Sequence, residues 1–267
     1  MKDRESFFEE VNSFKFLAKK EVGQNFLIDA SAAERIVSVL DVQENDCVLE
    51  IGCGAGSLTF FLNEIKAHGE AIDIDEAMLE KCRKDFPDSN MNIIQGNAMR
   101  WDYSKYTKIV GNLPYYITSG ILEKVLLGAS NCKKMAIMVQ KEAADRLLSP
   151  VGSKDYGPLN ILLSLSGSLK REFKVPRSSF APAPHVDSAV LSYIYKDNRD
   201  IELLGKVYSL ASSLFLQRRK TIANNLKTVM KDQAKATNIL LAAKIDPSKR
   251  PEQLTPEEYL TLTKASL

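Results

Sequence analysis

The amino-acid sequence predicts an α/β fold, a mostly parallel sheet of seven strands with an antiparallel edge, followed by a small all-helical domain. Short apolar, β-branched runs alternate with helical patterns, as in doubly wound sheets. The first five runs have almost no polar interruption, which is typical of strands covered on both faces. The last two follow without a clear helix between them, so we expect an antiparallel edge hairpin. The predicted strands are residues 47–53, 70–75, 92–96, 108–113, 135–139, 169–175 and 189–195.

Beyond a polar linker at residues 196–200, the sequence pattern becomes purely helical. Leu203, Val207 and Leu210 recur on one helical face, and Thr255 with the Pro and Glu residues that follow is typical of a helix start. We therefore expect two domains, residues 1–198 and residues 199–267. Residues 201–267 hold 11 Lys and Arg against six Asp and Glu, which suits a polyanionic partner and equally a solvated helical surface.

Composition places the chain among ordinary globular proteins, with 45% hydrophobic and 26% charged residues. No apolar run approaches the roughly 18 residues that span a bilayer. Residues 1–10 contain four acidic residues and no signal-peptide core. The four cysteines form no CxxC pair, so we expect reduced thiols and no metal site. The expectation is a cytoplasmic monomer that does not bind a membrane.

A glycine-rich turn follows the first predicted strand, in the order Gly52, Cys53, Gly54, Ala55, Gly56 after the acidic Glu50. Glycine lets the backbone turn tightly and approach a ligand, and the GxGxG spacing suits a compact ligand without phosphates. Incidental glycines at a strand–helix turn are the alternative.

Polar side chains also follow the next two predicted strands. Asp73 lies about 20 residues after the glycines, where a carboxylate can accept hydrogen bonds from ribose hydroxyls. Asp75 competes for this role, and either residue can instead cap the following helix. Asn97 ends the third strand near the same crevice. This arrangement resembles the class I, Rossmann-like methyltransferases, which use S-adenosylmethionine.

The fourth predicted strand ends in the tetrad Asn112, Leu113, Pro114, Tyr115, followed by Tyr116. An adenine amine is a weak nucleophile because its lone pair is delocalised into the ring. Two fixed acceptors, the Asn112 side-chain oxygen and the Leu113 carbonyl, can hold its hydrogens and turn the lone pair toward a methyl group. Pro114 fixes φ and removes a competing donor, and Tyr115 or Tyr116 can stack on a flipped base. The alternative is a strand-ending turn.

Three further segments narrow the resemblance to the ribosomal RNA adenine dimethyltransferases over about residues 19–230. Residues 23–27 read GQNFL, residues 180–188 match the family pattern F-x-P-x-P-x-V-x-S, and a basic run spans Arg218, Arg219 and Lys220. By the resemblance, Phe180 sandwiches the target base, whereas taken alone it would more often be a core aromatic. The basic run suits RNA phosphate contacts, with a solvated helix face as the alternative.

The resemblance also implies a set of S-adenosylmethionine contacts. Two positions depart from the family pattern: Asp73 stands where Glu is usual, and Asn97 where Asp is usual. We expect cofactor binding to survive both changes, in weakened form. The implied contacts are Asn25, Leu27, Gly52, Asp73, Asn97 and Asn112.

The implied activity is dimethylation of N6 on two adjacent adenosines of small-subunit (16S) ribosomal RNA, with the RNA or a pre-subunit particle as partner. The basic run is closer to the small-subunit enzymes than to the large-subunit resistance methylases, which remain an alternative. A ribosome-assembly factor with secondary methylation is the alternative of another class. A DNA adenine methyltransferase fits less well, because it would share the tetrad without the Phe180 segment.

Overall fold

The computed structural model describes residues 2–16 and 24–267. Contacts between Cα atoms divide the chain into two compact units. The first comprises Met1–Ala144 and Leu169–Tyr195, and the second Asp145–Ser168 and Lys196–Leu267. Residues 145–168 thus group with the C-terminal helices, although they precede the predicted domain boundary at residue 198. The division into domains 1–198 and 199–267 stays a prediction.

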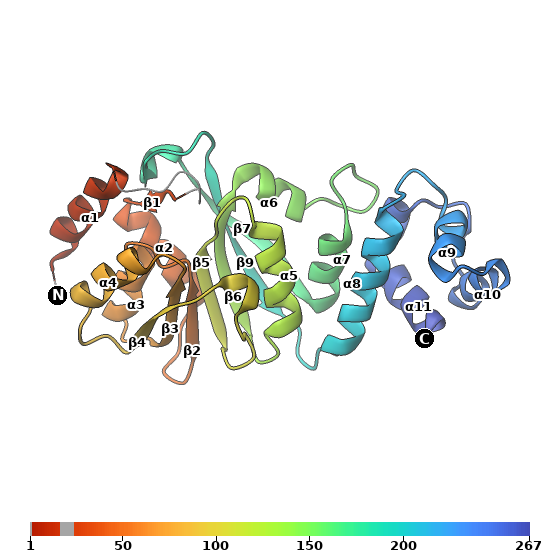
Figure 1. Cartoon of the computed structure of the whole chain (residues 1–267), viewed down its shortest axis with the longest axis horizontal. Helices are drawn as coiled ribbons and strands as arrows, with labels where there is room; N and C mark the ends of the chain where they lie inside the picture. The colour runs from red at the N-terminus through yellow and green to blue at the C-terminus, as the bar shows by residue number, and fades with distance from the viewer. Residues whose placement is uncertain (1, 17–23) are drawn as a thin grey trace. The chain divides into compact units, whose positions relative to one another are not determined.

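The first unit is built on a seven-stranded sheet in the order β4-β3-β2-β5-β6-β9-β7 (Figure 1). Strands β2 to β6 are parallel, and β9 runs antiparallel to β6. The predicted mostly parallel sheet with an antiparallel edge is therefore confirmed. The strands are β2 (Cys47–Ile51), β3 (His68–Asp73), β4 (Met91–Gln95), β5 (Lys108–Asn112), β6 (Lys134–Gln140), β7 (Gly167–Val175) and β9 (Ser188–Tyr195).

Helices pack against this sheet, α2 against β5, β6 and β9, and α4 against β3 and β4. Helix α2 buries Ile36 and Leu40 completely, as its apolar periodicity requires. The helices of this part of the chain are α1 (Arg4–Ser13), α2 (Ala30–Leu40), α3 (Ser57–Glu64), α4 (Glu76–Asp85), α5 (Thr118–Gly128) and α6 (Lys141–Leu147).

Helix α1 and a short pair of strands in the first unit were not predicted. Helix α1 buries Phe7 and Phe8 in an aromatic cluster with Phe60, whose ring centroid is 4.9 Å from that of Phe7. Strands β1 (Phe26–Leu27) and β8 (Phe180–Ala181) form a separate antiparallel pair. Both depend on partners far away in the sequence, so local patterns do not reveal them.

Strands β2 and β5 lie close together at the ends that lead into loops. Ile51 pairs with Gly111, and a Cβ on Gly111 would lie 2.5 Å from the Ile51 carbonyl oxygen. One residue further, Gly52 adopts a φ of +74°, and its Cβ would lie 3.3 Å from the Asn112 carbonyl oxygen. Only glycine meets both requirements, so the two strand ends lie side by side.

The second unit is helical, with α8 burying Val207 and Leu210 of the predicted apolar face, whereas Leu203 is partly exposed. Helix α11 begins as predicted, because Thr255 and Glu258 form a capping box. The helices are α7 (Pro158–Ser166), α8 (Ile201–Phe215), α9 (Ile222–Met230), α10 (Gln233–Ala243) and α11 (Pro256–Ser266). In residues 2–16 and 24–267, no helix has both the length and the apolar character needed to traverse a bilayer.

Replacing Gly111 with Ala should lower the free energy of unfolding by about 1–3 kcal/mol, because the new methyl group would press on the Ile51 carbonyl. Gly205→Ala is the matched control: it lies within α8, and a Cβ there meets nothing within 4 Å. That change should instead raise the free energy of unfolding by about 0.5–1 kcal/mol. Calorimetric unfolding of both variants measures the difference, and equal effects would contradict the close approach of β2 and β5.

Candidate active site

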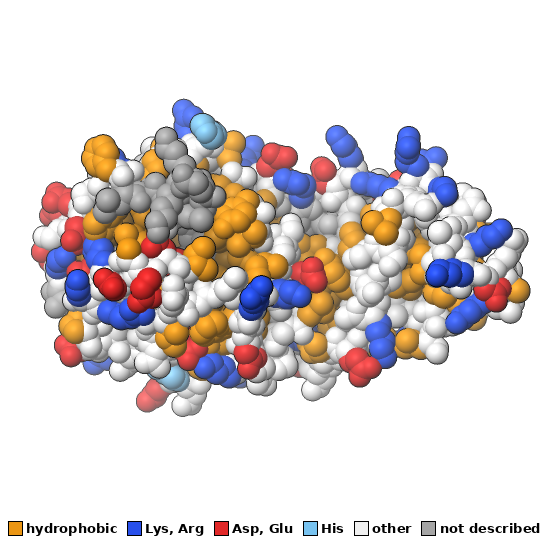
Figure 2. Space-filling model, viewed as in Figure 1, with side chains coloured by type: hydrophobic (Ala, Val, Ile, Leu, Met, Phe, Trp, Pro, Cys, Tyr) orange, Lys and Arg blue, Asp and Glu red, His pale blue; other side chains and the backbone are white. Residues whose placement is uncertain are grey.

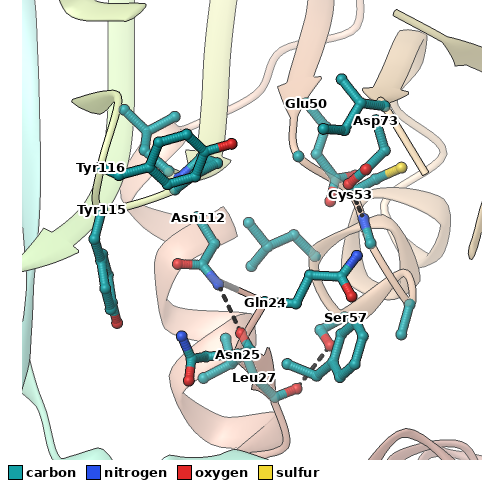
Figure 3. A pocket seen from close by; sticks show the side chains of 18 residues that line it. Gln24, Asn25, Leu27, Glu50, Cys53, Ser57, Asp73, Asn112, Tyr115 and Tyr116 are labelled. Atoms are coloured by element: carbon teal, nitrogen blue, oxygen red, sulfur yellow. Dashed lines mark hydrogen bonds between the residues drawn. The ribbon is translucent and has the colours of Figure 1, made fainter. Parts of the chain in front are cut away.

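The carboxyl ends of β2, β3 and β5 open into one cavity of about 790 Å³, part of which is open solvent (Figure 3). Small organic ligands bind in concave sites that combine apolar walls with a few polar groups, as this cavity does. The cavity also lies at the carboxyl edge of a doubly wound sheet, which is where such ligands bind. The lining residues are Gln24, Asn25, Phe26, Leu27, Glu50, Gly52, Cys53, Gly54, Ala55, Ser57, Leu58, Asp73, Ile74, Asn112, Leu113, Pro114, Tyr115 and Tyr116.

The tetrad forms the cavity wall after β5. The Asn112 side-chain nitrogen donates to the Asn25 carbonyl oxygen at 3.4 Å. Figure 3 shows the side-chain oxygen of Asn112 turned toward Tyr115. The Leu113 N–H donates to the Met138 carbonyl at 3.1 Å, which ties the backbone to β6. The amide therefore presents an acceptor rather than a donor on the Tyr115 side.

The glycine turn forms the opposite wall and is held by β3. The Gly52 and Cys53 N–H groups donate to the Ile72 carbonyl at 2.8 and 3.1 Å. The Gly54 N–H donates to a carboxylate oxygen of Asp73 at 2.9 Å. These hydrogen bonds hold the turn in place from the side of β3, and the backbone of the turn lines the cavity.

Asp73 has a structural role in addition to any ligand contact. Its second carboxylate oxygen accepts from the Asp75 N–H at 2.9 Å, and burial raises the pKa of this carboxyl. Asp75 in turn accepts from the Gln24 side chain at 2.9 Å. Asp73, rather than Asp75, lines the cavity, which agrees with the preference for Asp73 in the sequence.

Glu50 is a further candidate site residue, which the sequence pattern did not single out. Its side chain is buried, and one oxygen accepts from the Thr59 hydroxyl at 2.7 Å. The other oxygen has no hydrogen-bond partner among the described residues. Burial raises the pKa of Glu50 to about 7. A buried carboxyl with an unused acceptor in a cavity wall favours a ligand that brings a donor or a positive charge. The acid before the glycines was the available signal.

Several residues from the resemblance lie in this cavity wall: Asn25, Leu27, Gly52, Asp73 and Asn112, with Tyr115 and Tyr116 beside the tetrad. Asn97 does not. It is exposed after β4, and its side-chain oxygen accepts from the Met99 N–H at 2.9 Å as the cap of a short 3-10 helix. Of the GQNFL segment, Gly23 lies outside the described residues.

Phe180 is only 3% exposed and packs in the hydrophobic core of the first unit. It pairs with Leu27 across β8 and β1 and does not line the cavity. In this structure its ring is a core aromatic, which is the alternative that its sequence left open.

The basic run lies between α8 and α9, not within a helix. Arg218 is engaged inside the second unit: its guanidinium donates to the Lys154 carbonyl and, at 2.8 Å, to the Ser153 carbonyl, and its Nε lies 3.5 Å from a Glu252 oxygen. Arg219 and Lys220 are exposed. Arg218 thus fastens the loop, and the assignment of the basic run to RNA phosphate contacts stays a prediction.

Comparison with known proteins gives consistent results over nearly the whole chain. A model of the ribosomal RNA adenine dimethylase family matches residues 15–266. A ribosomal RNA small subunit methyltransferase A from Malacoplasma penetrans is 34% identical over 266 residues, covering 98% of this chain and 96% of the relative. The protein of the same name from Alkaliphilus metalliredigens is 37% identical over 269 residues, covering 95% and 93%.

Solved structures share the architecture. A dimethyladenosine transferase from Plasmodium falciparum has a TM-score of 0.74 at 27% identity, over 88% of this chain and 94% of that chain. The 23S rRNA methyltransferase ErmE has a TM-score of 0.65 at 23% identity, over 90% of this chain and 99% of that chain, a likeness of fold alone. The doubly wound sheet, glycine turn and tetrad are those of a Rossmann-like methyltransferase. Within that class, the chain belongs to the ribosomal RNA adenine dimethylase family.

The raised pKa of Glu50 predicts that the free energy of unfolding of the ligand-free protein depends on pH. Its pKa is about 7 when folded against 4.5 ordinarily, so between these values the folded state holds the proton more tightly. Stability should fall as pH rises through this window, by at most about 3 kcal/mol. Glu50→Gln removes this titration and keeps an oxygen for Thr59. Urea unfolding should show the variant gaining stability over the native chain from pH 5 to pH 8, and a constant difference would contradict the assignment.

Proposed function

We propose that this protein transfers methyl groups from S-adenosylmethionine to N6 of two adjacent adenosines in small-subunit ribosomal RNA, giving dimethyladenosines during ribosome biogenesis. One observation carries the proposal: the glycine turn and the Asn112 acceptor line the same cavity. The names of the relatives from Malacoplasma penetrans and Alkaliphilus metalliredigens support the small-subunit target.

The residues of the glycine side fit the methyl donor. The unpartnered Glu50 oxygen suits a cationic ammonium group, and the Asp73 carboxylate suits ribose hydroxyls. Gly52 has no side chain, which leaves space for the donor beside the Asn112 carbonyl; a Cβ there would crowd that carbonyl. S-adenosylmethionine, when bound, supplies a methyl group on a sulfonium, which is electrophilic enough that no strong base is needed. Asn25 and Leu27 complete the wall, and Asn97 is a proposed adenine contact from the resemblance.

The tetrad orients the acceptor. The Asn112 oxygen and the Leu113 carbonyl accept the two amine hydrogens, so the nitrogen lone pair points across the cavity toward the glycine turn. Pro114 sets the backbone angle, and the Thr118 hydroxyl donates to its carbonyl at 2.9 Å. Tyr115 and Tyr116 supply aromatic surface for a base that has left its stack.

The helical unit is proposed to hold the RNA backbone. Figure 2 shows many Lys and Arg side chains on the visible face of this unit. Arg219 and Lys220 are exposed and suit phosphate contacts, whereas Arg218 orders the loop that carries them. Phe180 can stack on the target base only if β8 opens, because its ring is buried here.

Replacing Asn112 with Ala should reduce methylation by on the order of 10²-fold or more, because one of the two amine acceptors is lost. Asn131→Ala is the matched control: this residue is exposed in the same unit and its side chain donates to the Ser104 carbonyl at 2.7 Å. Initial rates of methyl transfer and calorimetric donor titrations on both variants separate chemistry from donor binding. Full activity in Asn112→Ala would refute the assigned role.

The target is tested by incubating the protein with methyl-labelled S-adenosylmethionine and small subunits that lack adenine methylation. Primer extension should place the label on two adjacent adenosines of the small-subunit RNA. Label on large-subunit RNA or on DNA would refute the proposed substrate. Rescue of subunit maturation by Asn112→Ala without methylation would favour an assembly factor.

A further inference from the structure

Tyr115 has a buried partner that the cavity itself does not reveal. The Tyr115 and Ser188 hydroxyl oxygens are 3.0 Å apart and hydrogen-bonded. Ser188 is completely buried at the start of β9 and pairs with Gln140 of β6. The phenol is therefore anchored to a strand of the central sheet rather than left to solvent.

The segment that delivers Ser188 is fixed at both ends. At its beginning, Phe180 and Ala181 pair with β1, and the Ser179 hydroxyl donates to Asp29 at 2.8 Å. Near its end, the Lys141 N–H donates to the Asp187 carbonyl at 2.9 Å. Ser188 thus occupies a backbone position set by β1 on one side and β6 on the other.

Because the backbone of Ser188 is fixed, its hydrogen bond to the Tyr115 hydroxyl restricts where the Tyr115 ring can lie. An unpartnered Tyr side chain turns about two dihedral angles, and a buried hydroxyl without a partner is costly. Burial raises the pKa of Tyr115, so its hydroxyl stays protonated and remains available for this bond. The bond therefore selects one orientation of the ring, beside the Asn112 oxygen (Figure 3).

We propose that Ser188 is a positioning residue for methyl transfer, which acts on the target base only through Tyr115. This inference rests on the proposed function, because it assumes that an adenine lies against the Tyr115 ring. Ser188 touches neither the donor nor the base and does not line the cavity. Its contribution should therefore appear in the rate of the chemical step more than in binding.

Ser188→Ala should lower kcat about 10-fold, since a loosened ring misplaces the amine, with little change in donor affinity or in KM for the RNA. The decisive comparison places the same change in a Tyr115→Phe background, which has already lost the bond. There, Ser188→Ala should change kcat by less than about twofold, because the two residues act as one coupled pair.

Ser192→Ala is the matched control, since Ser192 lies on the same face of β9 and is also buried. Its hydroxyl donates to a Glu172 oxygen at 2.6 Å, and neither residue lines the cavity. It should leave kcat unchanged even if it lowers the melting temperature. Equal losses of kcat from Ser188→Ala in both backgrounds, or no loss in the native background, would overturn the inference while leaving the proposed function intact. Absence of methylation by the native chain would overturn both.

Discussion

The close approach of β2 and β5 is the constraint on which the rest of the site depends. Parallel pairing of Ile51 with Gly111 brings the two strand ends to the same edge of the sheet. The next residues, Gly52 and Asn112, then lie close together: a Cβ on Gly52 would crowd the Asn112 carbonyl oxygen at 3.3 Å, and its positive φ also favours glycine. In the proposed function, a methyl donor on the glycine turn and an adenine on the tetrad can meet because this pairing holds the two strand ends together. Strand register would then set the position of the substrate.

Around this contact, two acidic side chains line the cavity and play different parts. Asp73 uses both oxygens to hold backbone N–H groups of the surrounding turns, so its carboxylate is an organising group before any ligand arrives. Glu50 is different, because one of its oxygens has no partner among the described residues and burial opposes its charge. A buried carboxyl with a raised pKa makes the ligand-free protein less stable at higher pH, and it favours a cationic ligand. The membership of the ribosomal RNA adenine dimethylase family is consistent with such an occupant.

Local sequence patterns were sufficient to predict the seven strands and the tetrad. A buried parallel strand and a strand-ending turn each have a residue pattern that is only a few residues long. They were insufficient where the partner is distant. Phe180 is buried by pairing with Leu27, and Arg218 is engaged by a carbonyl 64 residues away, at Lys154. Neither contact has a local signature, because each joins residues that are far apart in the sequence. The Tyr115–Ser188 bond spans 73 residues and was missed for the same reason.

A crystal structure of the protein with S-adenosylhomocysteine and adenosine monophosphate would show directly whether the two strand ends bring donor and acceptor together. We expect the sulfur beside the glycine turn at Gly52 and the adenine amine within hydrogen-bond distance of the Asn112 side-chain oxygen and the Leu113 carbonyl. The adenine ring should lie against Tyr115. An adenine bound elsewhere, or a donor product that lies outside the cavity shared by the two strand ends, would contradict this expectation.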